Sequence, residues 1–241
     1  MLKKIIILLI LVSFISCGKT ILSLITPKDV ENSLRVMNRG NDTIIYLPMV
    51  HVAKPSYFTQ VKSVIDSLKK ENYTVFYESI TLQDNYLTND LDSATQKELF
   101  YKLRKFRKML GRFQINDLTD DNNKSLPNYY KNSSFISQTN SLIGLDSLDI
   151  NADVSMTELI NAQENIYGEI ILSDCDMKTK FNEKYKCKKV NSFYSINSFR
   201  DSVAIKKVLS AKKSKSLLIY GKGHWYGIWP YLRKEGFKEL E

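Results

Sequence analysis

Leu217-Leu218-Ile219-Tyr220-Gly221-Lys222-Gly223-His224, close to the C-terminus, is the segment most informative about the fold. Its apolar run predicts a short, fully buried strand. Gly221 and Gly223 then allow the backbone to turn sharply, and the turn ends by presenting His224. We therefore expect a buried strand with a histidine just beyond its C-terminal end.

A second stretch, from Thr43 to His51, has the same organisation nearer the N-terminus. It is an apolar strand followed by a histidine, and the chain of 241 residues contains only 2 histidines. Both histidines therefore follow predicted buried strands. This coincidence is the strongest functional signal in the sequence.

The segment after His51 predicts a helix and then another strand. Pro55 suits the first turn of that helix, where a missing N–H has no consequence. Apolar residues then recur at helical spacing: Tyr57, Val61, Val64, Ile65 and Leu68. Residues 73–77 predict the next strand, and Glu78 follows it directly. A strand–helix–strand unit of this kind joins parallel strands by a right-handed crossover.

Parallel neighbouring strands place their C-terminal ends on the same edge of a sheet, where open α/β sheets hold their ligands. His51 and Glu78 are therefore expected to lie close together. If residues 217–220 form a third parallel strand, His224 joins them. Each residue alone would be an ordinary loop residue, but the three together predict a functional site.

The remaining segments alternate between helix and strand. Polar segments at 82–90 and 111–140 predict a loop and a surface excursion or lid. Ser155 and Glu158 match a capping box at the start of one helix. Helices are predicted over 93–110, 156–171, 198–209 and 229–234, and strands over 141–145 and 148–154. This order predicts an α/β fold with a largely parallel central sheet and a helical or polar insertion in the middle.

The helix predicted over 93–110 carries much of the positive charge. Its apolar residues fall at helical spacing and predict a core-facing stripe: Leu99, Leu103, Phe106 and Leu110. The basic residues would then form a solvated face: Lys97, Lys102, Arg104, Lys105, Arg107 and Lys108. A dedicated binding surface is the alternative interpretation.

Residues 1–16 are typical of a secretory signal peptide. Lys3 and Lys4 precede an apolar run that ends at Ser16-Cys17-Gly18, and this run is too short to span a bilayer stably. The cysteine is similar to that of a bacterial lipobox, which implies that Cys17 becomes the lipid-bearing first residue, although Phe14 replaces the usual leucine. Simple secretion and an uncleaved anchor are the alternatives.

The chain is accordingly divided into a signal peptide over 1–16, a lipidated tether over 17–30 and a single α/β domain over 31–241. The anchor predicts a bacterial cell-envelope location, facing the periplasm or the exterior, with the membrane as partner. Loss of the two signal-peptide lysines lowers the formal net charge from +9 to +7. Attraction to anionic lipid or cell wall explains this charge, so nucleic acid is not an expected partner.

Cys175 and Cys187 remain after lipidation of Cys17. In an oxidising compartment they could form a disulfide that closes a short loop. Two separate thiols are the alternative, because sequence carries no information on sulfur geometry. Their spacing matches no zinc ribbon.

The two histidine-bearing stretches resemble motifs of the TraB/GumN/Tiki superfamily. Pro48-Met49-Val50-His51, followed after one helix by Glu78, is similar to its first motif, Gly-x-x-His with a downstream glutamate. Gly221-Lys222-Gly223-His224, followed by Gly227, is similar to its second Gly-x-x-His motif.

Two further segments add to the resemblance, which spans about residues 40–240. Arg200-Asp201 resembles the family's Arg-Asn/Asp pair, and residues 151–154 look like another family stretch. The resemblance implies a three-layer αβα arrangement, shared with the distantly related erythromycin-esterase-like and haem-binding ChaN-like proteins. Pro48 departs from the pattern, because proline cannot replace the motif glycine at positive φ and lacks an N–H donor. Substrate binding there is expected to differ, or activity to be lost.

The resemblance to Tiki-type proteins implies a metal-dependent peptidase. His51, Glu78 and His224 could bind manganese, cobalt or zinc and leave a position for an activated water. Without metal, His51 would act as general base with Glu78 orienting its ring, and His224 would protonate the leaving group.

The other assigned residues surround these three. Arg200 could stabilise an oxyanion, with an ordinary surface or salt-bridging arginine as the alternative. Gly221, Gly223 and Asp201 are assigned to substrate binding.

The expected function is therefore a lipid-anchored hydrolase of a peptide or a related amide or ester bond. The contrasting hypothesis is a non-catalytic ligand-binding lipoprotein of ChaN-like type, with haem as a candidate and Trp225 or Tyr226 lining a flat pocket. A purely structural envelope protein would leave the paired histidines unexplained.

Overall fold

The computed structural model describes residues 26–80, 93–106, 134–179, 186–188, 190 and 193–240. The signal peptide, the lipidation site at Cys17 and the loop expected over 82–90 lie outside these residues. So does most of the excursion expected over 111–140.

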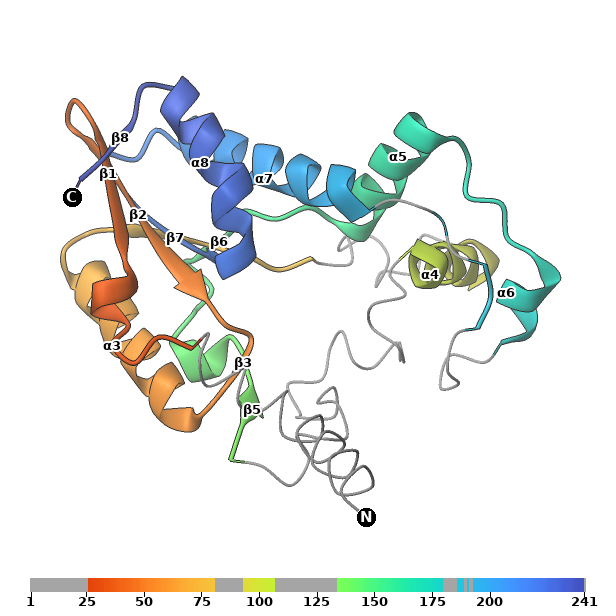
Figure 1. Ribbon diagram of the computed structural model, residues 1–241, viewed down its shortest axis with the longest axis horizontal. Coiled ribbons are helices and arrows are strands. Elements are labelled where there is room, and N and C mark those ends of the chain that lie inside the picture. The colour runs from red at the N-terminus through yellow and green to blue at the C-terminus, as the bar shows by residue number, and fades with distance from the viewer. Residues whose placement is uncertain are drawn as a thin grey trace, which may run out of the picture.

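A six-stranded sheet forms the centre of the molecule, in the order β6-β4-β7-β2-β1-β8 (Figure 1). The neighbours β6, β4, β7 and β2 pair in parallel, whereas β1 and β8 add an antiparallel edge. The strands are β1 (Arg35–Arg39), β2 (Asp42–Met49), β4 (Thr74–Tyr77), β6 (Ile150–Asn151), β7 (Lys215–Gly221) and β8 (Lys238–Glu239). The predicted α/β fold with a largely parallel sheet is confirmed.

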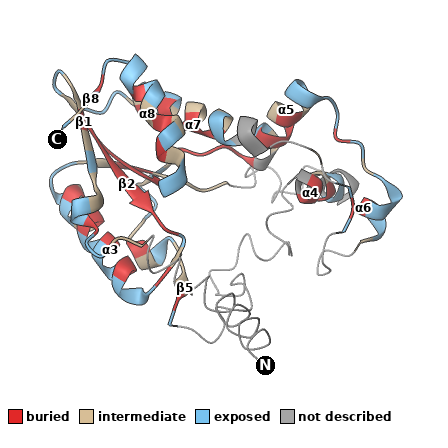
Figure 2. Ribbon diagram, in the orientation of Figure 1, coloured by how far each residue is buried: buried red, intermediate tan, exposed pale blue. Residues whose placement is uncertain are grey.

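Helices cover both faces of the sheet and complete three layers (Figure 1). Alternate residues of a strand point to opposite faces, so Leu217 and Ile219 pack towards α3 (Pro55–Lys70), which begins at the expected proline. Leu218 and Tyr220 pack on the other face, towards α7 (Phe193–Ser210) and α8 (Trp225–Lys234). The central strands are therefore buried on both faces (Figure 2).

The position of β7 corrects one expectation. The strands β2 and β4 were expected to be neighbours in the sheet. Instead, β7 lies between these two strands and pairs in parallel with both. Every residue of β7 after Lys215 is buried, as its central place in the sheet requires. As a result, the turn after β7 is flanked by the chain segments that follow β2 and β4.

The segments between β4 and β6 contain less strand than predicted. Residues 141–145 form not a strand but a 3₁₀ turn, η5 (Ser141–Ile143), which buries Ile143 against α3. The strand expected over 148–154 is reduced to the two residues of β6. An isolated apolar run fits both a strand and a buried turn, and here packing on α3 decided between them.

Short elements complete this part of the fold. A small second sheet joins β3 (Val52–Ala53) to β5 (Ile136–Ser137) in antiparallel pairing. The helix α5 (Met156–Tyr167) has the predicted capping box between Ser155 and Glu158. A 3₁₀ turn, η1 (Glu31–Ser33), precedes β1, and another, η6 (Lys222–His224), joins β7 to α8.

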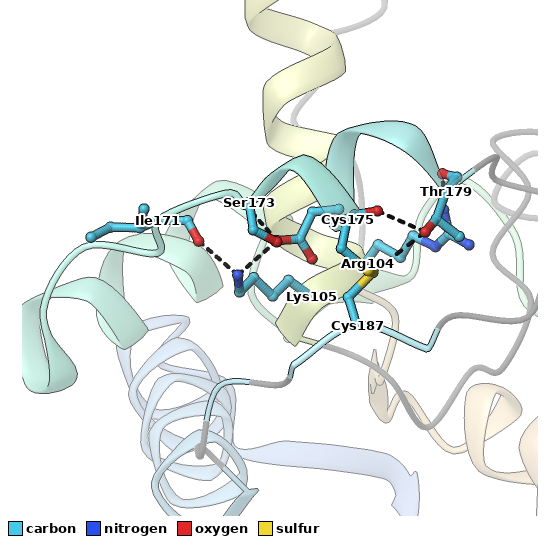
Figure 3. Close-up of a disulfide and its surroundings, with 8 residues drawn as sticks. Arg104, Lys105, Ile171, Ser173, Cys175, Thr179 and Cys187 are labelled. Atoms are coloured by element: carbon cyan, nitrogen blue, oxygen red, sulfur yellow. Dashed lines mark hydrogen bonds and ion pairs between the residues drawn. A yellow bond between two sulfur atoms is a disulfide. The ribbon is translucent and has the colours of Figure 1, made fainter.

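The helix α4 (Ser93–Phe106) lies with α5 and α6 (Asp174–Lys178) at one end of the molecule (Figure 1). Its basic face was expected to be solvated, and this is wrong for Arg104 and Lys105, which are buried. Lys105 Nζ lies 2.7 Å from the Asp176 carboxylate, and Arg104 donates to the Thr179 carbonyl at 2.6 Å (Figure 3). Both cations therefore attach α4 to α6.

A disulfide closes the same region. Cys175 of α6 is bonded to Cys187, 12 residues later (Figure 3). The sequence left open a disulfide or two separate thiols, and the structure contains the disulfide. The cross-link holds Cys187 beside α6, the helix that contacts Lys105 and Arg104.

Among the described residues, none of the helices combines the length and the apolar character that a bilayer crossing needs.

Replacing Asp176 by alanine is expected to lower the free energy of unfolding by about 3–5 kcal/mol, because it leaves the Lys105 ammonium buried without its carboxylate. Urea unfolding of the two proteins measures this difference. Asp174→Ala is the matched control, because Asp174 forms an exposed pair with Lys178 on the same helix. Equal small effects of both variants would contradict a structural role for the buried pair.

Candidate active site

Three chain segments meet at the C-terminal edge of the parallel strands. His51 follows β2, Glu78 follows β4 and Gly221 ends β7. The Glu78 carboxylate lies between the two histidines, with Oε2 at 3.8 Å from His51 Nε2 and Oε1 at 3.4 Å from His224 Nε2. The expected grouping of His51, Glu78 and His224 is therefore present in the structure.

Position 221 requires glycine because the backbone passes close to two side chains, not because of its backbone angle. Its φ is −52°, which any residue can adopt. A Cβ at this position would lie 3.1 Å from both Glu78 Oε2 and His51 Nε2, and the Gly221 N–H donates to Glu78 Oε2 at 2.7 Å. Gly221 therefore positions Glu78, and the contact with substrate expected for it stays a prediction.

Arg200 fixes the other oxygen of Glu78. From α7, its Nη2 donates to Glu78 Oε1 at 2.6 Å, while Nε and Nη2 donate to the two oxygens of Asp153 at 3.0 and 2.5 Å. Lys207 contacts the backbone carbonyl of Asp153. Two interpretations were open for Arg200, an oxyanion-stabilising group and a salt-bridging arginine. The structure has the salt bridges, since the guanidinium is buried and bound to carboxylates.

His224 is held by a second acid of α7. Its Nδ1 lies 2.5 Å from Asp201 Oδ1, and its ring packs edge-on against Tyr220. Gly227, one turn into α8, leaves the space for this acid, because a Cβ there would collide with the Asp201 carboxylate. Asp201 is buried behind His224 and, like Gly221, positions the site instead of facing substrate.

The surrounding charges shift the proton equilibria of these groups. Burial alone would raise the pKa of Glu78, but the hydrogen bond from His224 and the charge of Arg200 hold that pKa well below its usual range. Burial would lower the pKa of His224, whereas hydrogen bonds to Asp201 and Glu78 outweigh it and raise the pKa to about 9. Burial raises the pKa of Asp201, and the contact with His224 opposes this only in part. At neutral pH, His224 is therefore an imidazolium between two carboxylates.

His51 differs from its neighbours because its side chain is 56% exposed. Gln138, beyond β5, holds it twice: the Gln138 N–H donates to the His51 carbonyl at 2.8 Å, and Oε1 lies 3.1 Å from His51 Nδ1. An amide oxygen can only accept, so the tautomer that completes this contact has its proton on Nδ1 and its acceptor at Nε2. Of His51, Glu78 and His224, His51 is thus the most exposed to solvent.

The residues expected to bind manganese, cobalt or zinc do not fit a metal in this arrangement. The Arg200 guanidinium lies 2.6 Å from Glu78 and 3.3 Å from His224 Nε2, so a permanent positive charge adjoins two of the three expected ligands. The raised pKa keeps His224 protonated, whereas a metal needs its lone pair. Among the described residues, no group of three or more His, Cys, Asp or Glu side chains has the arrangement of a metal site.

The two aromatic residues after His224 lie in different environments. Trp225 is only 7% exposed and stacks on Trp229 in the core, so it does not line the flat pocket suggested for haem. Tyr226 is exposed. A Cβ added to Gly223 would meet nothing within 4 Å, so Gly223 borders open space, as a residue that contacts substrate would.

Three residues of the site were not identified as functional from sequence. Asp153 and Gly227 lie within stretches that resemble family motifs, and this was the only available signal for them. No sequence pattern identifies Gln138. It reaches His51 because β3 pairs with β5, and strands of two residues each are too short for this pairing to be predicted.

The stability contributed by His224 is expected to decline at alkaline pH. Its pKa rises from 6.5 to about 9 on folding, so its stabilisation is complete below about pH 6.5 and disappears as the pH rises through 9. Urea unfolding should show the wild type losing up to about 3 kcal/mol relative to His224→Gln between these limits. A difference independent of pH would show that His224 is not protonated in the fold.

No protein-family model, no curated protein and no solved structure matches this chain. The TraB/GumN/Tiki resemblance therefore remains a hypothesis that rests on the motifs in the sequence.

Proposed function

We propose that this protein is a hydrolase of an ester or amide bond, in which His51 activates water at the C-terminal edge of the sheet. The observation that carries the proposal is the contrast between His51 and its surroundings. An exposed imidazole, with one nitrogen fixed by Gln138, stands beside a buried carboxylate that is held from two other elements. Such an arrangement is typical of a general base with its orienting groups.

The reaction begins with proton transfer from water to His51 Nε2, as the water oxygen attacks the carbonyl carbon. The Glu78 carboxylate, 3.8 Å away, stabilises the imidazolium that forms. The same nitrogen then returns the proton to the leaving alcohol or amine as the tetrahedral intermediate collapses. In this proposal His51 serves first as base and then as acid. From the sequence alone, the second step, protonation of the leaving group, was assigned to His224.

The buried residues keep Glu78 ionised and immobile. Arg200 and the protonated His224 are two cations, and they face three carboxylates: Glu78, Asp153 and Asp201. A network that is already hydrogen-bonded needs no rearrangement during the reaction, which supports its role as a fixed electrostatic environment.

The oxyanion is assigned to backbone N–H groups at the start of η6 and α8, in place of Arg200. Gly223 borders open space in this turn, and the N-terminal end of a helix favours negative charge. A carbonyl group bound over Gly223 would therefore lie near these donors.

The cellular setting of the proposal is a lipid-anchored hydrolase of the bacterial envelope. Lys3, Lys4 and the apolar run before Cys17 support export and lipidation. The Cys175–Cys187 disulfide supports an oxidising compartment independently of that signal.

His51→Gln is expected to lower kcat/KM by about 100- to 10,000-fold on the ester or amide that the wild type cleaves, because the general base is lost. A panel of nitrophenyl esters and aminoacyl nitroanilides identifies that substrate, and urea unfolding confirms that the variant stays folded. Exposed Lys54→Gln, just beyond His51, is the matched control. Activity that survives in His51→Gln would overturn the proposal.

Two additions to the assay distinguish the other hypotheses. Chelation by EDTA should leave the activity unchanged, and activity restored only by manganese, cobalt or zinc would instead support the metal-dependent mechanism. A Soret band on haem titration, lost in His51→Gln and without turnover on any substrate, would support the ligand-binding lipoprotein.

Gln138→Leu should lower kcat by about tenfold or more and leave KM nearly unchanged, because His51 loses the acceptor that keeps the proton on Nδ1. Gln138→Glu retains an acceptor and should restore most of the rate. Steady-state kinetics on the substrate found above tests both variants. A change in KM alone would show that Gln138 contacts substrate rather than orienting His51.

A further inference from the structure

A cavity lies at the opposite edge of the sheet from His51. It has a volume of about 190 Å³ and lies where β2 and β7 begin, below the end of α7. Its wall is apolar where it meets the core and charged at the rim. The lining residues used below are Ile44, Val208, Phe237, Ser216, Lys212 and Lys213.

Ser216 provides a buried polar group in the wall of this cavity. The residue is 1% exposed, and its hydroxyl has no hydrogen-bond partner among the described residues. It shares the α7 side of β7 with Leu218 and Tyr220, so its side chain points away from α3. A buried hydroxyl without a partner is rare in folded proteins and requires an explanation.

The rim of the cavity has a cationic excess. Arg39, Lys212 and Lys213 line it with a single acid, Asp42, which already pairs with Arg39 at 3.0 Å. Within the described part of the chain, no hydrogen bond or ion pair engages the ammonium group of Lys212 or Lys213. Two cations are therefore available to a ligand beside a buried hydroxyl.

We propose that this cavity binds a small organic carboxylate with a short apolar chain. The carboxylate would pair with Lys212 and Lys213 and accept a hydrogen bond from Ser216, while the chain packs on Ile44, Val208 and Phe237. The volume is below the roughly 300–1,000 Å³ of sites for drug-sized ligands, so the ligand is correspondingly small. This site is independent of the proposed hydrolase site.

A structural role explains only part of these observations. Lys212 and Lys213 follow the C-terminal end of α7, where cations stabilise the helix dipole. That role requires neither a cavity nor the buried Ser216 hydroxyl. A ligand that satisfies both the cations and the hydroxyl explains the three features together.

Isothermal titration of the protein with sodium hexanoate tests the proposal, with hexylamine and inorganic phosphate as comparison probes. We expect saturable binding of one hexanoate and a rise in melting temperature, with no binding of hexylamine and at least tenfold weaker binding of phosphate. Lys212→Ala and Ser216→Ala should each weaken hexanoate binding at least fivefold. Lys70 is an exposed lysine on α3, on the other face of the sheet, and Lys70→Ala should leave hexanoate binding unchanged.

Three outcomes would overturn the proposal: no saturable hexanoate binding, hexylamine binding as tightly as hexanoate, or affinity unchanged in both cavity variants. Urea unfolding shows that each variant is folded before titration. Since Ser216→Ala removes an unpartnered buried hydroxyl, that variant should be at least as stable as the wild type without ligand. A stability loss in Ser216→Ala without hexanoate would also count against the proposal, because it would reveal a protein partner for the hydroxyl.

Discussion

The position of β7 between β2 and β4 is the constraint on which the rest of the structure depends. A strand in the middle of a parallel sheet is buried on both faces and hydrogen-bonded on both sides, so it must be apolar and continuous. The run Leu217–Tyr220 meets this requirement, with alternate residues packed against α3 and against α7 and α8. The parallel pairing then brings the segments that follow three strands to one edge, and the proposed active site is a consequence of that pairing.

The site combines a rigid, charged interior with one accessible group. A buried network of hydrogen bonds and ion pairs joins five residues: Arg200, Asp153, Asp201, Glu78 and His224. Removing one partner from a buried network of this kind leaves an uncompensated charge. The network therefore fixes the position of Glu78, and in the proposed mechanism His51 is the residue through which a substrate would meet it.

The placement of charge also separates the two edges of the sheet. At the C-terminal edge the buried carboxylates are paired with Arg200 and His224, whereas the cavity at the other edge has a cationic rim and, in its wall, a hydroxyl without a hydrogen-bond partner among the described residues. About 16 Å of strand separates Ser216 from Gly221, for a rise of about 3.3 Å per residue. The two sites can therefore be altered and tested separately.

The sequence by itself determined the order of the main elements, the α/β class and the convergence of His51, Glu78 and His224. Apolar runs, helical spacing and the residues that follow each strand are local properties, and parallel strands share an edge whatever lies between them. Only the tertiary structure decided the rest. It placed β7 between β2 and β4, buried Lys105 against Asp176, turned Arg200 into the partner of Asp153, and brought Gln138 to His51. These outcomes depend on contacts between residues far apart in the chain, and spacing along the sequence does not encode the distances between them.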